Sequence, residues 1–168
     1  MINLRKPTLA ALPGPAAGAG LAIALACDMR IAAESAFVTT GYARIGLSGD
    51  YGIAWLLTRA VGNARARELL FLSDRIDAIR ATNIGLVNEV VADEVLQDKA
   101  RELALRLANG PRLALAKMKD NLDDATQIDY RTALDREAER LIETAGHSDH
   151  TQALQAFVEK RAARFEKG

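Results

Sequence analysis

A glycine-rich turn at residues 14–20 constrains the fold of this chain more than any other stretch. The apolar run before it, residues 8–12, predicts a buried strand, and the strand must end at Pro13-Gly14-Pro15 because proline cannot donate to a sheet ladder. Small residues after Gly20 predict a helix over residues 21–27. A strand, a tight turn and a helix in this order favour an α/β layer over a helical bundle.

The same turn predicts a site for negative charge, because glycine lets backbone N–H groups point outward where a helix begins. It is not a nucleotide phosphate loop, since the required Lys and hydroxyl are missing at Leu21 and Ala22. It does not have the G-x-G-x-x-G spacing of a dinucleotide site either. Two interpretations stay open: an oxyanion hole built from backbone N–H groups, or simply close packing of helix against strand.

The pattern changes along the chain, from short strands to helices. Further strands are expected at residues 29–33, 37–40 and 86–91. Helices are expected at residues 53–61, 64–72, 77–83, 92–109, 111–122, 128–145 and 148–165. Ser148 and Asp149 offer an N-cap for the last helix. We therefore expect a core at residues 1–72 and a mainly helical region at residues 73–168.

The amino-acid composition limits the ligands and the compartment that are expected for this chain. Lys and Arg together number 22, as do Asp and Glu, so no basic surface for nucleic acid is expected. Cys27 is the only cysteine and lies in an apolar run, which predicts a small buried side chain and a reducing, cytoplasmic compartment. Prolines and glycines interrupt the apolar stretch at residues 9–27, so neither a signal peptide nor a membrane span is expected. His147 and His150 have no ligand partners at metal spacing, and no metal is expected.

Four stretches, in order along nearly the whole chain, resemble the crotonase superfamily, also called the enoyl-CoA hydratase/isomerase family. They are residues 6–32, with the signature pattern K-P-x-x-A-A followed by the glycine turn and A-L-A-C-D-x-R-I-A, and residues 45–69, 81–91 and 156–165. The resemblance implies a partial β-β-α spiral of the ClpP/crotonase type with C-terminal helices. It also implies that the family's N-terminal segment, which supplies a second oxyanion N–H, is lacking.

The resemblance also implies roles for individual residues. The backbone N–H of Ala19 matches one donor of the family's oxyanion hole, which holds the thioester oxygen of an acyl-CoA. Phe157 and Lys160 match positions that contact the adenine end of coenzyme A. Coenzyme A is then part of the substrate, no separate cofactor is expected, and a homo-oligomer, trimer or hexamer, is implied.

The sequence departs from the hydratases of this family at both catalytic glutamates. Ala22 stands where the first acid is found and Tyr42 where the second is found, and neither is a good base near neutral pH. Asp50, in the turn Ser48-Gly49-Asp50-Tyr51-Gly52, matches a single acid that isomerases of the family use to shuttle a proton. We therefore expect Asp50 to be the catalytic residue; the alternative is that it caps the helix that follows, since Asp is a favoured N-cap, and one residue can serve in both ways.

The sequence therefore predicts an acyl-CoA enzyme of the hydratase/isomerase type, with proton transfer by Asp50 favoured over addition of water by two glutamates. The alternative is a non-catalytic homologue that binds coenzyme A or serves as an assembly subunit.

Overall fold

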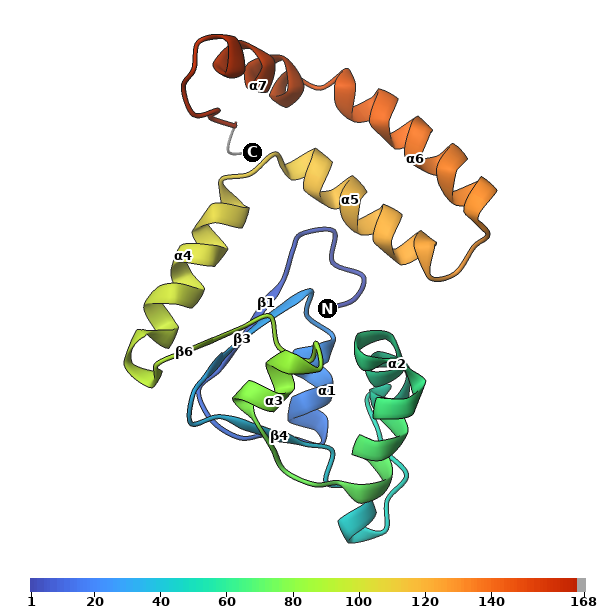
Figure 1. Ribbon diagram of the computed structural model, residues 1–168. Coiled ribbons are helices and arrows are strands. Elements are labelled where there is room, and N and C mark those ends of the chain that lie inside the picture. Colours follow the sequence, from blue (N-terminus) through green and yellow to red (C-terminus); the bar gives the residue numbers. More distant parts are fainter. Residues whose placement is uncertain (166–168) are drawn as a thin grey trace. The chain divides into compact units, whose positions relative to one another are not determined.

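The computed structural model describes residues 1–165, which form two compact units. The first comprises residues 1–2 and 8–103, and the second comprises residues 3–7 and the chain from residue 104 onward. Figure 1 shows the elements of each. Residues 73–103, which we expected in the helical C-terminal region, cluster with the first unit because Ile76, Ala81 and Leu86 are buried in its core.

Two small sheets organise the first unit (Figure 1). The first sheet has the strand order β1-β3-β6 and is parallel throughout; its strands are β1 (Leu9–Leu12), β3 (Met29–Ala33) and β6 (Glu89–Val91). The second sheet pairs β4 in parallel with β2 and antiparallel with β5; its strands are β2 (Ala16–Ala17), β4 (Phe37–Thr39) and β5 (Ile76–Asp77). Parallel pairing with helical crossovers confirms the expected α/β class.

Three helices and two 3₁₀ turns complete this unit: α1 (Ala19–Leu25), η1 (Ala43–Ile45), α2 (Ile53–Leu72), α3 (Ala78–Asn83) and η2 (Asp93–Val95). The two helices expected at residues 53–61 and 64–72 are joined in α2, which Gly62 interrupts with non-helical angles of φ 77° and ψ 166°. The core lies between the sheets and α1, α2 and α3, with Ile31, Leu57 and Ala81 fully buried.

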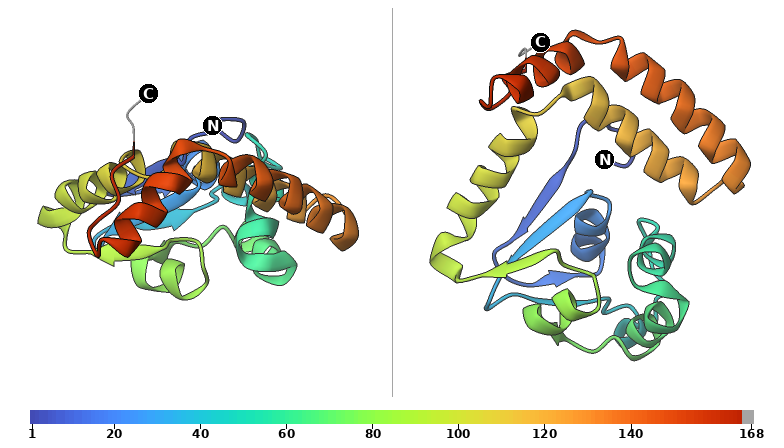
Figure 2. Two further views of the ribbon diagram at one scale, coloured as in Figure 1. Left: turned by 90° about the horizontal axis from the view of Figure 1, so that it is seen from above. Right: turned by 45° about the horizontal axis from the view of Figure 1, so that its top comes forward.

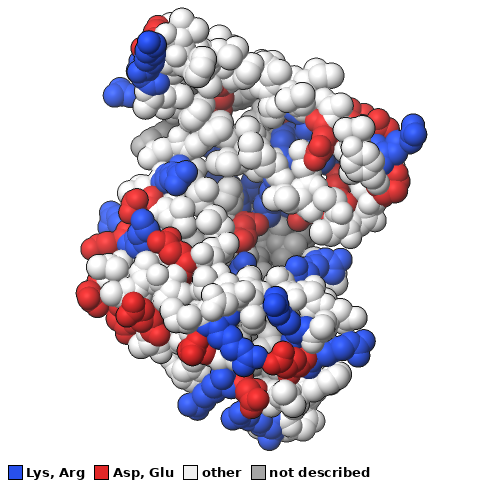
Figure 3. Space-filling view, in the orientation of Figure 1, with Lys and Arg blue, Asp and Glu red and all other residues white. Residues whose placement is uncertain are grey.

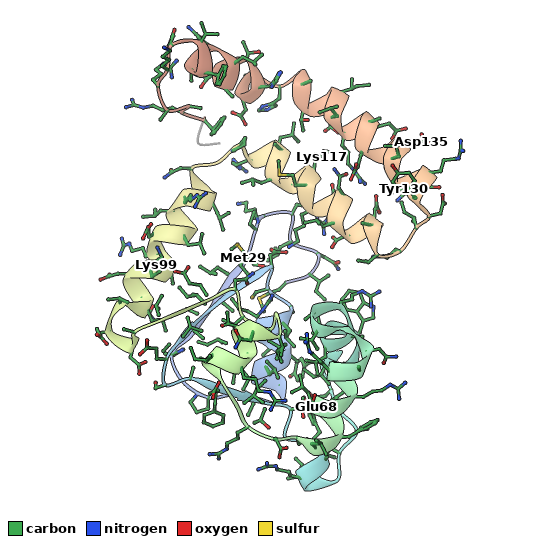
Figure 4. All side chains as sticks on the ribbon, in the orientation of Figure 1. Met29, Glu68, Lys99, Lys117, Tyr130 and Asp135 are labelled. Atoms are coloured by element: carbon green, nitrogen blue, oxygen red, sulfur yellow. The ribbon has the colours of Figure 1, made fainter. Side chains whose placement is uncertain are left out.

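The second unit is helical. After α4 (Leu96–Ala108), which spans the boundary, come α5 (Arg112–Ala125), α6 (Tyr130–Ala145) and α7 (Ser148–Val158). Helices α5 and α6 run side by side, as Figure 1 and the right view of Figure 2 show. The carboxylate of Asp124 on α5 accepts hydrogen bonds from two arginines of α6, Arg136 at 2.9 Å and Arg140 at 2.7 Å, and these ion pairs join the two helices. Figure 4 labels Lys117 of α5, whose Nζ lies 2.7 Å from a carboxylate oxygen of Glu143.

Several expected boundaries were wrong. The last helix ends at Val158 rather than at residue 165, and the strand expected at residues 86–91 is paired only over Glu89–Val91. Ser148 is the first residue of α7 and not its cap; His147 is the cap, and its Nδ1 accepts from the N–H of Asp149 at 3.2 Å. In the part of the chain that is described, no helix has the length and apolar character needed to span a bilayer.

Candidate active site

The glycine turn leaves backbone amides free at the start of α1, among them the amide of Ala19. Gly18 takes φ 49° and ψ −118°, donates to the carbonyl of Thr39 at 3.1 Å, and accepts from the N–H of Ala22 at 3.0 Å. Ala19 follows as the first helical residue and is half-buried. Within residues 1–165, the N–H of Ala19 has no hydrogen-bond partner, as is usual for the first residue of a helix. The amide is therefore available to an incoming acceptor.

Ala22 and Tyr42 stand at the two positions where hydratases of the resembled family carry glutamate, and their surroundings differ. Ala22 is only 1 % exposed and is part of the core that α1 forms with its neighbours. Tyr42 is also buried, at 6 % exposed, but its hydroxyl meets the only carboxylate of the following loop. No carboxylate is present at either position.

Asp50 lies in a turn whose backbone demands glycine. Gly49 has φ 118°, and a Cβ added to it would lie 2.8 Å from Cγ2 of Ile53, so a larger residue is excluded there. Tyr51 and Gly52 also take positive φ, of 47° and 73°. A backbone hydrogen bond joins this turn to α2: the N–H of Ile53 donates to the carbonyl of Asp50 at 3.0 Å.

The side chain of Asp50 does not cap α2. The cap residue of this helix is Gly52, and no side chain bonds to its first turn. Instead, a carboxylate oxygen of Asp50 accepts a hydrogen bond from the phenolic hydroxyl of Tyr42. The capping interpretation of Asp50 is therefore wrong, and the carboxylate is directed to a buried tyrosine.

Tyr42 joins this carboxylate to the glycine turn. A Cβ placed on Gly18 would lie 3.6 Å from both Cζ and the hydroxyl oxygen of Tyr42, so the phenol ring packs directly over that glycine. Burial raises the pKa of Tyr42 to about 12, and its hydrogen bond to Asp50 acts in the same direction. The phenol consequently stays protonated and remains a donor at any pH near neutrality.

A buried polar cluster fixes the segment that carries Tyr42. The hydroxyl of Thr40 donates to the carbonyl of Leu69 at 2.7 Å and lies 2.9 Å from the hydroxyl of Ser73, which has no exposed surface. The Ser73 hydroxyl also accepts from the N–H of Ala43 at 3.2 Å. The backbone on both sides of Tyr42 is thereby tied to the end of α2. We define Thr40, Ala43 and Ser73 as the anchor cluster.

The two residues expected at the adenine end of coenzyme A lie in the second unit. Phe157, near the end of α7, is 83 % exposed. Lys160 follows with φ 53°, and its N–H donates to the carbonyl of Phe157 at 3.1 Å. Both side chains are exposed to solvent, as residues that contact a ligand or a second chain must be in the isolated chain.

The remaining polar candidates have structural contacts. Cys27 is buried, as expected. Asp28 accepts from both the N–H and the hydroxyl of Thr8 at 2.7 Å and so ties the start of β1 to the end of α1. Among residues 1–165, no cluster of three or more His, Cys, Asp or Glu side chains has the arrangement of a metal site.

Comparison with known proteins decides the family. Residues 1–168, the whole chain, match the family described as enoyl-CoA hydratase/isomerase. The chain belongs to the enoyl-CoA hydratase/isomerase family. It is 38 % identical, over 98 % of its length, to 1,2-epoxyphenylacetyl-CoA isomerase of Escherichia coli, of which it covers 63 %. It is 36 % identical, over 94 % of its length, to short-chain-enoyl-CoA hydratase of Clostridium acetobutylicum, of which it covers 60 %.

More distant and structural relatives agree with this assignment. A 4-chlorobenzoyl coenzyme A dehalogenase of Arthrobacter is 30 % identical over 95 % of the chain, which covers 58 % of that protein. The crystal structure of an enoyl-CoA hydratase from Bacillus anthracis superposes with a TM-score of 0.95 at 34 % identity, covering 99 % of this chain and 65 % of that one. The fold is thus the crotonase fold, and the chain spans slightly less than two thirds of the length of these relatives.

Reasoning from the sequence missed the pairing of Tyr42 with Asp50. The two residues are eight positions apart in a loop without helical or strand periodicity, so no pattern predicts their contact. The anchor cluster was missed for the same reason, since Ser73 is thirty residues beyond Ala43. A polar run ending a strand, Thr39-Thr40-Gly41-Tyr42, was the only available signal.

Proposed function

We propose that this chain is an acyl-CoA enzyme that works through an enolate, with Asp50 as the acid/base group and the N–H of Ala19 as an oxyanion donor. The observation that carries the proposal is the position of the Asp50 carboxylate. It is hydrogen-bonded to Tyr42, and Tyr42 packs over Gly18, the residue directly before the free amide of Ala19. A base and an anion-binding amide near one another are what proton abstraction beside a carbonyl requires.

The chemistry is a balanced proton transfer within one substrate. Asp50 takes a proton from the carbon next to the thioester carbonyl, and the electron pair of that C–H bond moves onto the carbonyl oxygen to form an enolate. The N–H of Ala19 holds the oxygen while the charge is present. In a 3-enoyl thioester the same carboxyl group returns the proton to the γ-carbon, which leaves the conjugated 2-enoyl thioester. General-base action of this kind contributes about 10²–10⁴ in rate and each oxyanion donor about 10²–10³.

Isomerisation is favoured over hydration because the groups that would activate water are absent. Ala22 has no ionisable side chain, and the phenol of Tyr42, with a pKa of about 12, is not a base near neutral pH. One carboxylate suffices for moving a proton between two carbons. Among the relatives, the E. coli protein is by name an isomerase of a CoA thioester.

We further propose that Phe157 and Lys160 contact the adenine end of coenzyme A. An exposed aromatic ring and an exposed ammonium group suit an adenine face and a phosphate. The substrate supplies the coenzyme A and no separate cofactor takes part. The cytoplasm, where acyl-CoA thioesters are available, is the proposed compartment.

Assembly into a homo-oligomer, a trimer or hexamer, is part of the same proposal. Helices α5 and α6 carry large apolar side chains in the open, among them Leu122, Leu134 and Leu141. A groove of about 390 Å³ lies between these helices and is lined by Met118, Leu134 and Leu141 together with polar residues. Figure 3 shows that charged groups interrupt the uncharged surface of these helices and gather toward the outer end of α6. An apolar surface of this kind favours contact with a second chain.

The test replaces Asp50 with Asn and follows hydrogen exchange at the carbon beside the carbonyl. The protein is incubated in D₂O with but-3-enoyl-CoA and with phenylacetyl-CoA, and mass spectrometry counts the deuterium in the recovered thioester. Asp50→Asn is expected to lower exchange by at least about 10²-fold while acetyl-CoA binding, measured by calorimetry, is unchanged. Asp135→Asn, at an exposed carboxylate of α6 labelled in Figure 4, is the matched control and should exchange like the wild type.

Full exchange by Asp50→Asn would refute the assigned role. A wild-type protein that binds acetyl-CoA but exchanges no hydrogen would favour the alternative function, a non-catalytic subunit that binds coenzyme A or serves in assembly.

A further inference from the structure

The Asp50 carboxylate lies on a loop that offers it little support of its own. Three of the four residues Gly49 to Gly52 take positive φ, and the neighbouring side chains Leu47 and Tyr51 are exposed. A base on such a loop samples several rotamers unless another group selects one. Within the described residues, the side-chain partner that the carboxylate does have is the hydroxyl of Tyr42.

Tyr42, by contrast, is held firmly. Its ring is buried over Gly18, and its carbonyl accepts from the N–H groups of Ile45 at 3.1 Å and Leu47 at 3.0 Å. The anchor cluster fixes the backbone on either side of it. The phenol is thus held by burial and by hydrogen bonds on both sides of its residue, whereas the Asp50 carboxylate relies on the bond from Tyr42.

We propose that Tyr42 is the positioning residue for Asp50: its hydroxyl holds the carboxylate beside the glycine turn in one orientation. This inference rests on the proposed function, because it assigns a role to the partner of the proposed base. A hydrogen bond donated to a carboxylate is strong and directional, so it selects one orientation of the side chain. The donor is dependable because burial keeps the pKa of the phenol at about 12.

The alternative is that the pair merely stabilises the loop. The two possibilities differ in what they predict for the kinetics of the folded enzyme. A purely structural bond affects the amount of folded protein and leaves the kcat of each folded molecule unchanged. A positioning bond affects the kcat of the folded enzyme while KM stays nearly the same.

The experiment compares wild type, Tyr42→Phe and Asp50→Asn by steady-state isomerisation of but-3-enoyl-CoA across the pH range. Tyr42→Phe is expected to lower kcat by about 10–100-fold, the range for loss of a hydrogen bond to a charged group, while KM changes by less than about threefold. Tyr130→Phe, the same change at the exposed start of α6 (Figure 4), should match the wild type.

A second measurement, which needs neither turnover nor the Tyr42 variant, keeps the inference falsifiable if that variant does not fold. With ¹³Cζ-labelled tyrosine, NMR follows ionisation of Tyr42 in wild type and in Asp50→Asn. Loss of the carboxylate is expected to lower the ionisation midpoint of Tyr42 from about 12, because the charge and the hydrogen bond of Asp50 both raise it. An unchanged midpoint would overturn the inference.

The two proposals fail differently. If Asp50→Asn is inactive but Tyr42→Phe keeps the wild-type kcat, the positioning role is wrong and the proposed function stands. If Asp50→Asn is fully active, the proposed function itself is wrong and the role of Tyr42 falls with it.

Discussion

The raised pKa of Tyr42 predicts how the stability of the first unit depends on alkaline pH. In the unfolded chain this phenol loses its proton near its ordinary pKa of 10.0, whereas in the folded protein it keeps the proton until about 12. The folded state therefore binds this proton more tightly than the unfolded state does. Its contribution to stability is fully present below about pH 10 and is lost as the pH rises through about 12.

The size of the effect follows from the shift. One pKa unit corresponds to about 1.4 kcal/mol, so the whole contribution is at most about 2.7 kcal/mol. Between about pH 9 and about pH 11 the folded state should lose up to about 1.3 kcal/mol of this through Tyr42. In Tyr42→Phe nothing titrates at this position, so the variant should lose that much less than the wild type over the same interval.

The assay is urea unfolding at the two pH values, followed by the fluorescence of Trp55. This residue is the only tryptophan in the chain and lies on α2, so its signal reports on the unit that contains Tyr42. Tyr130→Phe, with its phenol 82 % exposed on α6, controls for the loss of a phenol elsewhere. An identical loss of stability in wild type and in Tyr42→Phe would refute both the burial of the phenol and the cause assigned to its pKa.

Further predictions concern residues that stabilise the site and residues that are proposed to bind coenzyme A. Ser73→Ala should lower the free energy of unfolding by about 1–3 kcal/mol, measured by urea, because it leaves Thr40 and a backbone N–H short of a buried partner; a change below about 0.5 kcal/mol would contradict this. Gly49→Ala should be destabilised by at least about 1 kcal/mol and lose turnover, since its Cβ meets α2 at 2.8 Å; wild-type melting and activity would contradict the turn geometry. Phe157→Ala combined with Lys160→Ala should weaken acetyl-CoA binding by about tenfold or more in calorimetry without altering the melting temperature, and unchanged affinity would remove both residues from the proposed contact.

The sequence predicted those parts of the fold that depend on local patterns. The strand at residues 29–33 was found as β3, and the strand before the glycine turn as β1, because each is a compact apolar run with a clear stop. The two-residue strands β2 and β5 were missed, since each exists only through its pairing with β4. No run of two residues has a pattern that indicates a strand.

The candidate site was predictable only in its separate parts. The sequence indicated both the glycine turn and Asp50 as parts of the site. It did not decide whether Asp50 acts as a base or caps the helix that follows. Its contact with Tyr42 depends on the positive φ values of the loop and on the anchor cluster formed with the distant end of α2. Such contacts follow from tertiary structure, which residue types and spacing do not specify.

The most direct test of the central claim removes the N–H of Ala19. Ala19→Pro does this at the first position of a helix, where proline is well tolerated. Tyr130→Pro makes the same backbone change at the first residue of α6, whose N–H also lacks a partner among the described residues. We expect Ala19→Pro to keep its fold by circular dichroism and to lose about 10²–10³ in α-hydrogen exchange, while Tyr130→Pro stays within about twofold of wild type. A folded Ala19→Pro protein that exchanges hydrogen at the wild-type rate would contradict the account.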